Sequence, residues 1–505
     1  MDTLSLLALL VGLAVCSVHS VDPPDNIGKE YVLMFMENFK LEKNRNFPLE
    51  VYISTPEKTP ARVTIKSPIS ANPRVDQTVT VNPGSVQRVN ISEAFRMVGS
   101  VQSSKGLLIQ SDQDIAVYGA NKDTLSNDVY CALPVDTLGT EYYAACYGPA
   151  QIKTELGVAS TQDSTSVTVT LPSKDKSLTV DFMGKTYKAG EVIHTKLDKY
   201  QTLQLQSSQD LTGAHIVSDK PVAAFSGNIK TNIGTGIYAD HLVEQLTPVD
   251  TWGKKFVTVP IPKRTTGDFF RIIASEDNTE VTISGMTPIK IPKAGEWVQV
   301  SIPSGEHKMV TSTKPVMLMQ YVLSQQNATE PADPSMITIP PYELFGAKYT
   351  FSTPQYSRPD YGAGYSYEHE FMVVVKDADR NTLLLDDKPF PSNAHWTTIP
   401  GTDLVGGYVT ISAGSHTVRN TDPTALIGGF LYGHAFHESY GFPTGMRLAK
   451  INAPCKRTSP IPGDGIDNDC DGKIDEELCT PSNNKRGRSN QGYTISSESK
   501  FLAKR

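Results

Sequence analysis

The chain has 505 residues, of which 39% are hydrophobic and 20% are charged, a composition typical of folded globular proteins. It is too long for one ordinary hydrophobic core and should divide into several domains or repeats. Its formal net charge is −7, and no basic stripe runs through the body of the chain, which argues against nucleic-acid binding.

A short apolar segment begins the chain. Residues 4–15 are almost entirely apolar, and small and polar residues follow as far as Ser20. This length matches the core of a secretory signal and is too short to span a bilayer, although no Lys or Arg precedes the segment. We therefore predict a signal peptide at residues 1–20, a secreted, extracellular protein and no transmembrane anchor.

One short pattern occurs four times: an acidic residue, then Gly, then a charged and an aromatic residue ahead of a β-like run. Its glycines lie 111, 114 and 93 residues apart, and a partial fifth copy follows near Gly441. Spacing of this kind predicts internal repeats, which we place at residues 21–138, 139–252, 253–345 and 346–450. We expect each glycine to permit a turn and each aromatic residue to begin the first strand of its repeat. The residues concerned are Gly28, Gly139, Gly253 and Gly346, with Tyr31, Tyr142, Phe256 and Tyr349.

Two polar turns between β-type runs are expected in every repeat, and both are typical of hairpins. In the first repeat, one hairpin would join residues 51–54 to 62–65, and a second, tighter one would turn at Asp112. In the third repeat, Pro315 would occupy the second turn. Helical periodicity is confined to one or two turns at Ser92–Met97.

The number and size of these segments predict the fold class. About seven short strands in roughly 100 residues is the size of a β-sandwich. We predict an all-β protein of four internal repeats, each a β-sandwich-like unit. The alternative is a closed, propeller-like ring of the four units.

Cysteines and sequons are consistent with export. Cys131 and Cys146 would close a loop of about 15 residues, a bridge worth about 3 kcal/mol. Five cysteines remain after signal removal, so one is free or bonds to another chain, and the sequence does not say which of the last three is unpaired. The last three are Cys455, Cys470 and Cys479. Asn90 and Asn327 begin Asn-x-Ser/Thr sequons and are predicted glycosylation sites.

An acid-rich segment at residues 455–479, bounded by cysteines, has the spacing of an EF-hand-type loop. Acidic residues stand at alternate positions, a glycine follows for the sharp turn, and one backbone carbonyl is added. Hard oxygen ligands of this kind favour Ca²⁺, so we predict a structural calcium site. The predicted ligands are Asp467, Asp469, Asp471, Lys473 through its carbonyl, Asp475, and Glu476 or Glu477 in place of the usual twelfth-position Glu. Residues 480–505 are predicted to be a basic, disordered tail.

Several longer motifs carry a resemblance to a known family. They are residues 240–256, 333–341, 345–354, 267–271 and 438–445. Taken in chain order, these motifs resemble the N-terminal domain of the IgGFc-binding protein family over residues 28–450. The resemblance implies a binding or structural module of secreted or surface proteins, often of mucus or extracellular coats. No Fc-contact residue can be carried over to this chain. The acid-rich segment is similar to short Cys-containing metal-binding repeats and to thrombospondin type 3 calcium loops.

Motifs for catalysis are weak. His369-Glu370 and His434 to Glu438 lack the helical spacing that zinc proteases need, and no nucleophile elbow, P-loop or dinucleotide fingerprint occurs. Trp252, Phe345 and Tyr440 are expected to pack in the core and not to form carbohydrate platforms. We therefore predict no enzyme, no catalytic residue and no cofactor other than Ca²⁺.

These features predict a secreted binding or structural protein of extracellular matrix, mucus or an adhesive coat. It would act through contacts with extracellular proteins or glycans, with a disulfide-linked partner through the odd cysteine as a further expectation. One alternative is a soluble lectin-like or immune recognition protein, and another is a glycan-active enzyme. The sequence does not identify the ligand or the oligomeric state.

Overall fold

The computed structural model describes residues 24–41, 46–148, 151–325, 333–356, 366–422, 424–435 and 437–452, with residues 457–458, 479–480 and 494–495. Residues 25–453 form one compact unit, and residues 1–24 with 454–505 form another. In the latter, the described elements are β35 (Cys479–Thr480) and β36 (Thr494–Ile495), which pair antiparallel. Everything below concerns residues 25–453.

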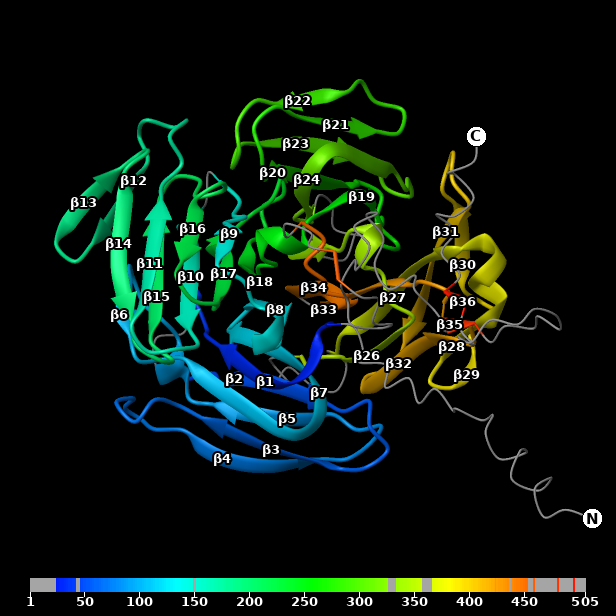
Figure 1. Cartoon of the computed structure of the whole chain (residues 1–505), viewed down its shortest axis with the longest axis horizontal. Helices are drawn as coiled ribbons and strands as arrows, with labels where there is room; N and C mark the ends of the chain where they lie inside the picture. The colour runs from blue at the N-terminus through cyan, green and yellow to red at the C-terminus, as the bar shows by residue number, and fades with distance from the viewer. Residues whose placement is uncertain are drawn as a thin grey trace, which may run out of the picture. The chain divides into compact units, whose positions relative to one another are not determined.

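The predicted all-β class is confirmed (Figure 1). The described helices are single 3₁₀ segments: η1 (Glu93–Phe95), η2 (Val135–Thr137), η3 (Val249–Thr251), η4 (Tyr342–Leu344) and η6 (Asp377–Thr382). The turn expected at Ser92 is η1, where the Ser92 hydroxyl accepts a hydrogen bond from the Ala94 N–H. Across the described residues, the structure contains no helix long and apolar enough to cross a membrane.

One order of strand pairing recurs along the chain. In the N-terminal sheet, the long strand β7 is shared by two layers. The strand order is β4-β3-β7-β2-β5, and β1 and β8 also pair with β7. The strands are β1 (Ile27–Leu33), β2 (Leu49–Ser54), β3 (Ala61–Lys66), β4 (Asp76–Val81), β5 (Gln87–Ile91), β7 (Leu107–Asp123) and β8 (Ser126–Cys131).

The next stretch of chain divides the same arrangement between two sheets, because the long strand is interrupted. The sheet β18-β17-β10-β15-β6 comprises β6 (Val101–Ser103), β10 (Thr154–Ser160), β15 (Thr202–Ser207), β17 (Val222–Thr231) and β18 (Asp240–Gln245). The sheet β14-β11-β16-β9 comprises β9 (Glu141–Tyr143), β11 (Thr165–Thr170), β14 (Val192–Leu197) and β16 (His215–Ser218). A separate pair is formed by β12 (Thr179–Phe182) and β13 (Lys185–Lys188).

The third stretch returns to a single shared strand, with the order β22-β21-β24-β20-β23 and with β19 and β25 also on β24. Its strands are β19 (Gly253–Val257), β20 (Asp268–Ala274), β21 (Thr279–Ile283), β22 (Ile289–Ile291), β23 (Trp297–Ile302), β24 (Met309–Val322) and β25 (Met336–Ile339).

The last stretch is again divided. The sheet β26-β32-β28-β29 comprises β26 (Lys348–Ser352), β28 (Leu383–Leu385), β29 (Lys388–Pro389) and β32 (Ser415–Asn420). The sheet β30-β31-β27-β33-β34 comprises β27 (Glu368–Lys376), β30 (His395–Thr398), β31 (Leu404–Ile411), β33 (Gly428–Ala435) and β34 (Glu438–Gly445).

Both predicted hairpins of the first repeat are wrong. β2 pairs with β5 and β7, whereas β3 pairs with β4 and a different part of β7, so the turn between β2 and β3 connects two layers. The expected turn at Asp112 lies inside β7, where the pairing with β1 shifts between Gly28 and Glu30. The polar residues there form a bulge that lets one strand serve both layers. β24 contains the same irregularity opposite Gly253 and Lys255.

The glycines of the repeated pattern serve a different purpose from the predicted turn. None of the four has a positive φ. Instead, a Cβ on Gly139 would lie 2.5 Å from Cβ of Pro248, and one on Gly253 would lie 2.2 Å from Cβ of Pro341. Gly28, Gly139 and Gly253 therefore each admit the proline just ahead of the next copy of the pattern, which makes these three copies contacts between neighbouring parts of the chain. A Cβ on Gly346 would instead meet the ring of Tyr349.

Buried side chains extend across the predicted repeat boundaries. The cluster around β1 to β8 also contains Phe225 and Val243, and the cluster around β9 to β18 also contains Ile273 and Tyr321. Trp252, Phe345 and Tyr440 are at most 2% exposed, which confirms their assignment to the core. The two ends of this unit meet, because Asp25 bridges Arg447 and the Asn26 N–H donates to the Met446 carbonyl. The predicted units thus share their cores with their neighbours.

Candidate functional site

The strands β8, β18, β25 and β34 contact one another in a closed cycle, and each is the last strand of its sheet in chain order. Figure 1 shows β8, β18 and β34 close together near the middle of the view. Asp128 of β8 is fully buried among them. Its Oδ1 accepts from the Val129 N–H at 2.9 Å, and its Oδ2 accepts from the Val243 N–H of β18 at 3.1 Å. Burial raises the pKa of Asp128, and the N–H groups of Val243, Val129, Met336 and Gly441 oppose that rise. This carboxylate therefore links backbones that belong to different sheets.

Two further side chains of β18 act in the same way. Glu244 Oε1 accepts from the Thr338 N–H of β25 at 2.9 Å. Gln245 Oε1 accepts from the Leu133 N–H, which follows β8, at 3.1 Å. Buried backbone donors need partners, and here side chains supply those that the sheets do not. The polar residues at this centre hold the central strands in register.

Asp240 and Asp333 are two further buried carboxyl groups whose charges affect each other. Asp240 Oδ1 accepts from the N–H groups of Asn127 at 2.5 Å and of His241 at 2.8 Å, whereas Oδ2 has no hydrogen-bond partner among the described residues. Burial and the neighbouring Asp333 raise the pKa of Asp240. Burial also raises the pKa of Asp333 to about 7, and Lys230 opposes the rise in both groups. The pair is thus arranged to retain a proton near neutral pH.

The pH dependence of stability tests this arrangement. Asp333 titrates near pH 4 when unfolded and near 7 when folded, so the folded state binds its proton more tightly. Its contribution to stability is complete below about pH 4 and is lost as the pH rises through about 7. We expect Asp333→Asn to flatten the loss of stability between about pH 5 and pH 8 in urea unfolding. An exposed control, Asp403→Asn, should behave as wild type, and a variant curve parallel to wild type would contradict the assignment.

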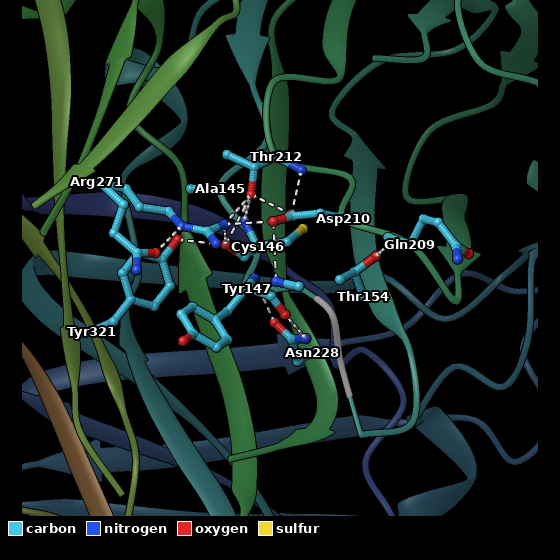
Figure 2. A network of polar contacts seen from close by, with 12 residues as sticks. Ala145, Cys146, Tyr147, Thr154, Gln209, Asp210, Thr212, Asn228, Arg271 and Tyr321 are labelled. Atoms are coloured by element: carbon cyan, nitrogen blue, oxygen red, sulfur yellow. Dashed lines mark hydrogen bonds and ion pairs between the residues drawn. The ribbon is translucent and has the colours of Figure 1, made fainter. Parts of the chain in front are cut away.

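A second buried polar network is centred on Arg271 of β20 (Figure 2). Its Nη1 donates to the Cys146 carbonyl at 2.7 Å, to Asp210 Oδ2 at 2.8 Å and to Thr212 Oγ1 at 2.8 Å. Its Nε donates to Gln299 Oε1 at 3.0 Å. The guanidinium carbon lies 3.9 Å from the centroid of the Trp297 ring, with the rings of Tyr147 at 4.8 Å and Tyr321 at 5.3 Å.

This network joins two sheets that are distant in sequence. Arg271, Trp297 and Tyr321 come from the sheet around β24, whereas Cys146, Asp210 and Thr212 flank the sheet around β16. The Arg271 side chain is only 2% exposed, so the guanidinium charge is balanced by Asp210 and the aromatic faces. Its planar shape allows hydrogen bonding and stacking at once, which Lys cannot match.

Cys131 and Cys146 are both free and buried, so the structure does not contain the predicted bridge between them. Cys131 packs with Tyr118 and Phe442, whereas Cys146 packs with Leu156 and Trp252 in a separate cluster. The chain between them runs through η2 into the next sheet and so separates the two thiols. Burial raises the pKa of both thiols, which keeps them protonated and unreactive.

One set of described residues has the ligand types and proximity for a metal ion. Glu368 and Glu370 of β27 and His434 of β33 place one potential ligand atom each within 4.8 Å of the others. The two carboxylates stand at alternate positions of one strand, and His434 lies directly opposite Glu368 in the antiparallel pair. A search for helical His-Glu motifs misses this set, because its residues lie on two strands. The signal in the sequence is Glu-x-Glu on a β-type run, which places both carboxylates on one face of the sheet.

The other predicted site residues fall mostly outside the described residues. This holds for the acidic residues Asp467 to Glu477, for Cys455 and Cys470, for Asn327, and for the signal segment. Cys479 begins β35 opposite Ile495. Asn90 lies on β5 opposite Glu50 and is exposed, a position that a glycan could occupy.

The family model described as IgGFc binding protein matches residues 128–433, more than half of the chain. The chain therefore belongs to the IgGFc-binding protein family.

Among curated proteins, the chain is similar to the IgGFc-binding protein of Homo sapiens, with 26% identity over 449 residues. The match covers 88% of this chain and 8% of the human protein, so the chain spans a small part of that relative's length.

Proposed function

We propose that this is a secreted, non-enzymatic binding and structural protein of an extracellular matrix, mucus or adhesive coat. Family membership and the relative's name support a binding role, and the N-terminal apolar segment supports secretion. The observation that carries the proposal is the use of the buried carboxylates. The carboxylates of Asp128 and Glu244 accept hydrogen bonds from backbone N–H groups of neighbouring strands, as expected for side chains that stabilise a scaffold.

The binding proposal is tested with the full mature chain. We expect the immobilised protein to retain a defined set of proteins or glycans from the secretion in which it occurs, or to form calcium-dependent assemblies. A single discrete hit on a glycan array would favour a soluble lectin-like or immune recognition protein. Turnover of a glycan that one carboxylate substitution abolishes would replace the proposal with a glycan-active enzyme. Absence of both binding and assembly would overturn it.

Calcium binding by residues 467–477 is a separate proposal, supported by the alternate carboxylates and the turn glycine at Gly472. Extracellular sites of this kind bind Ca²⁺ at about 10⁻⁴–10⁻³ M. We expect calorimetry on the full chain to show one such site and Asp469→Asn to weaken it by at least about tenfold, since one charged ligand is lost. Asp175→Asn, which alters an exposed aspartate elsewhere, is the control. Equal calcium binding by wild type and Asp469→Asn would contradict the assignment.

The three cysteines near this segment carry the remaining disulfide proposal. Because Cys131 and Cys146 are free thiols, Cys455, Cys470 and Cys479 are left to pair. Three is odd, so we propose one bridge that pins the calcium segment and one thiol available for a disulfide-linked partner. Non-reducing electrophoresis of the secreted protein would show a dimer or a mixed disulfide that reductant removes.

A further inference from the structure

Glu368, Glu370 and His434 form a cluster on one face of the sheet β30-β31-β27-β33-β34. Glu370 is fully buried, Glu368 is exposed, and His434 lies between these extremes. His434 comes from β33 and is the direct cross-strand partner of Glu368, so the backbone pairing sets the spacing of the cluster. The positions follow from sheet geometry and do not depend on a loop.

A lysine already lies between the two carboxylates. Lys263 Nζ lies 2.6 Å from Glu370 Oε1 and also contacts Glu368. Thr410 Oγ1 of β31 donates to the Glu370 carboxylate at 3.0 Å. The Lys263 side chain is 41% exposed, so it can leave for solvent without losing a buried position. Two carboxylates and one ammonium leave a net charge of −1, which a divalent cation in place of the ammonium would neutralise.

The imidazole supplies the second, independent observation. His434 Nε2 has almost no contact with solvent and no hydrogen-bond partner among the described residues. A neutral imidazole has a lone pair on one of its two ring nitrogens, and Nε2 is a ring nitrogen without a hydrogen-bond partner in the described part of the chain. A buried acceptor without a donor is costly, and a metal ion would remove that cost.

We propose that Glu368, Glu370 and His434 form a divalent transition-metal site, with Zn²⁺ as the best-fitting ion. One imidazole and two carboxylates are ligands that Zn²⁺ accepts at about 2.0–2.2 Å. Ca²⁺ fits less well because it prefers six to eight oxygen ligands. Lys263 occupies the carboxylates when the metal is absent and moves to solvent when it binds. The fourth position lies on the side of the exposed Glu368, where water completes the tetrahedron.

Titration of the full chain with ZnCl₂, in buffer that holds saturating CaCl₂, tests the site. Removing the imidazole in His434→Gln is expected to weaken Zn²⁺ binding by at least about tenfold, since a three-ligand site becomes a two-ligand site. Lys263→Met is expected to strengthen Zn²⁺ binding, because the competing cation is gone. Two opposite shifts from neighbouring residues cannot arise from loss of folding alone. Loading with Co²⁺ should give a visible absorption band that His434→Gln lacks.

Matched variants act as controls. His395→Gln alters another histidine, on β30 and stacked on Tyr408, and should bind Zn²⁺ as wild type does. Lys293→Met removes an exposed lysine paired with Asp277 and should not raise Zn²⁺ affinity. If neither wild type nor Lys263→Met binds Zn²⁺, or if His434→Gln binds it as wild type does, the cluster is an ion pair only and the proposal is overturned.

Discussion

Arg271→Met is expected to lower the free energy of unfolding by about 3–5 kcal/mol, the range for breaking a buried ion pair by removal of one partner. The substitution leaves the Asp210 carboxylate without its cation, removes one of the donors to the Cys146 carbonyl and opens the stack on Trp297. Because the guanidinium joins the sheet around β24 to the sheet around β16, the substitution weakens the contact between these two sheets. Urea unfolding followed by tryptophan fluorescence measures it, since Trp297 lies 3.9 Å from the guanidinium carbon.

Arg271→Lys separates charge from shape at the same position. Lys keeps the positive charge but has neither the planar stack nor the forked donors, so the loss should fall between those of wild type and Met. Arg380→Met, which removes a partly exposed arginine 3.3 Å from Asp377, should leave the unfolding midpoint nearly unchanged. If Arg271→Met unfolded at the wild-type midpoint, Arg271 would not join the two sheets as described.

Asp128→Ala is expected to lower the free energy of unfolding by about 2–6 kcal/mol. The buried N–H groups of Val129 and Val243 lose their acceptor, at about 1–3 kcal/mol each. Water cannot replace the carboxylate easily, since Asp128 is fully buried between central strands. The measurement is the free energy of unfolding in urea, with amide hydrogen exchange at Val243 as a local report. Exchange at Val243 should accelerate more than exchange at the outer strand β4.

Asp128→Asn keeps one acceptor oxygen and should lose less stability than Asp128→Ala. Asp403→Ala, at a side chain that is 72% exposed, is the surface control. A smaller effect for Asp128→Ala than for Asp403→Ala would show that the central strands do not depend on this carboxylate.

The positions of the strands could be predicted from sequence because alternation is a local signal. In β3, Ala61, Val63 and Ile65 are buried and Arg62 is exposed, as the pattern of β-branched and polar residues requires. The same reasoning found η1 and placed the repeated pattern at the entry to each β region. The family resemblance over residues 28–450 was also legible in the chain, and the family match over residues 128–433 bears it out.

The pairing of strands could not be predicted in the same way. β2 and β3 are separated by a short polar turn, yet they lie in different layers because each finds partners elsewhere along β7. Turn residues do not show whether a chain reverses within one layer or crosses to another. The bulge within β7 likewise resembles a hairpin turn in sequence.

Sites whose residues come from several strands could not be predicted from the sequence for a related reason. Glu370 and His434 are far apart in the chain and meet only because β27 pairs with β33. Cys131 and Cys146 are close in the chain but lie in separate clusters, which led to a bridge that the structure does not contain.

The sequence by itself determined the all-β class, the places where strands begin and the family of this protein, since these depend on residue type and local spacing. Only the tertiary structure decided which strands pair, why the repeated glycines are required and which polar side chains meet. Those outcomes depend on long-range hydrogen bonding and close packing, as in the contact of Gly253 with Pro341 and the bonds of Asp128 to neighbouring backbones. No local pattern encodes such contacts, because each depends on where a distant segment lies.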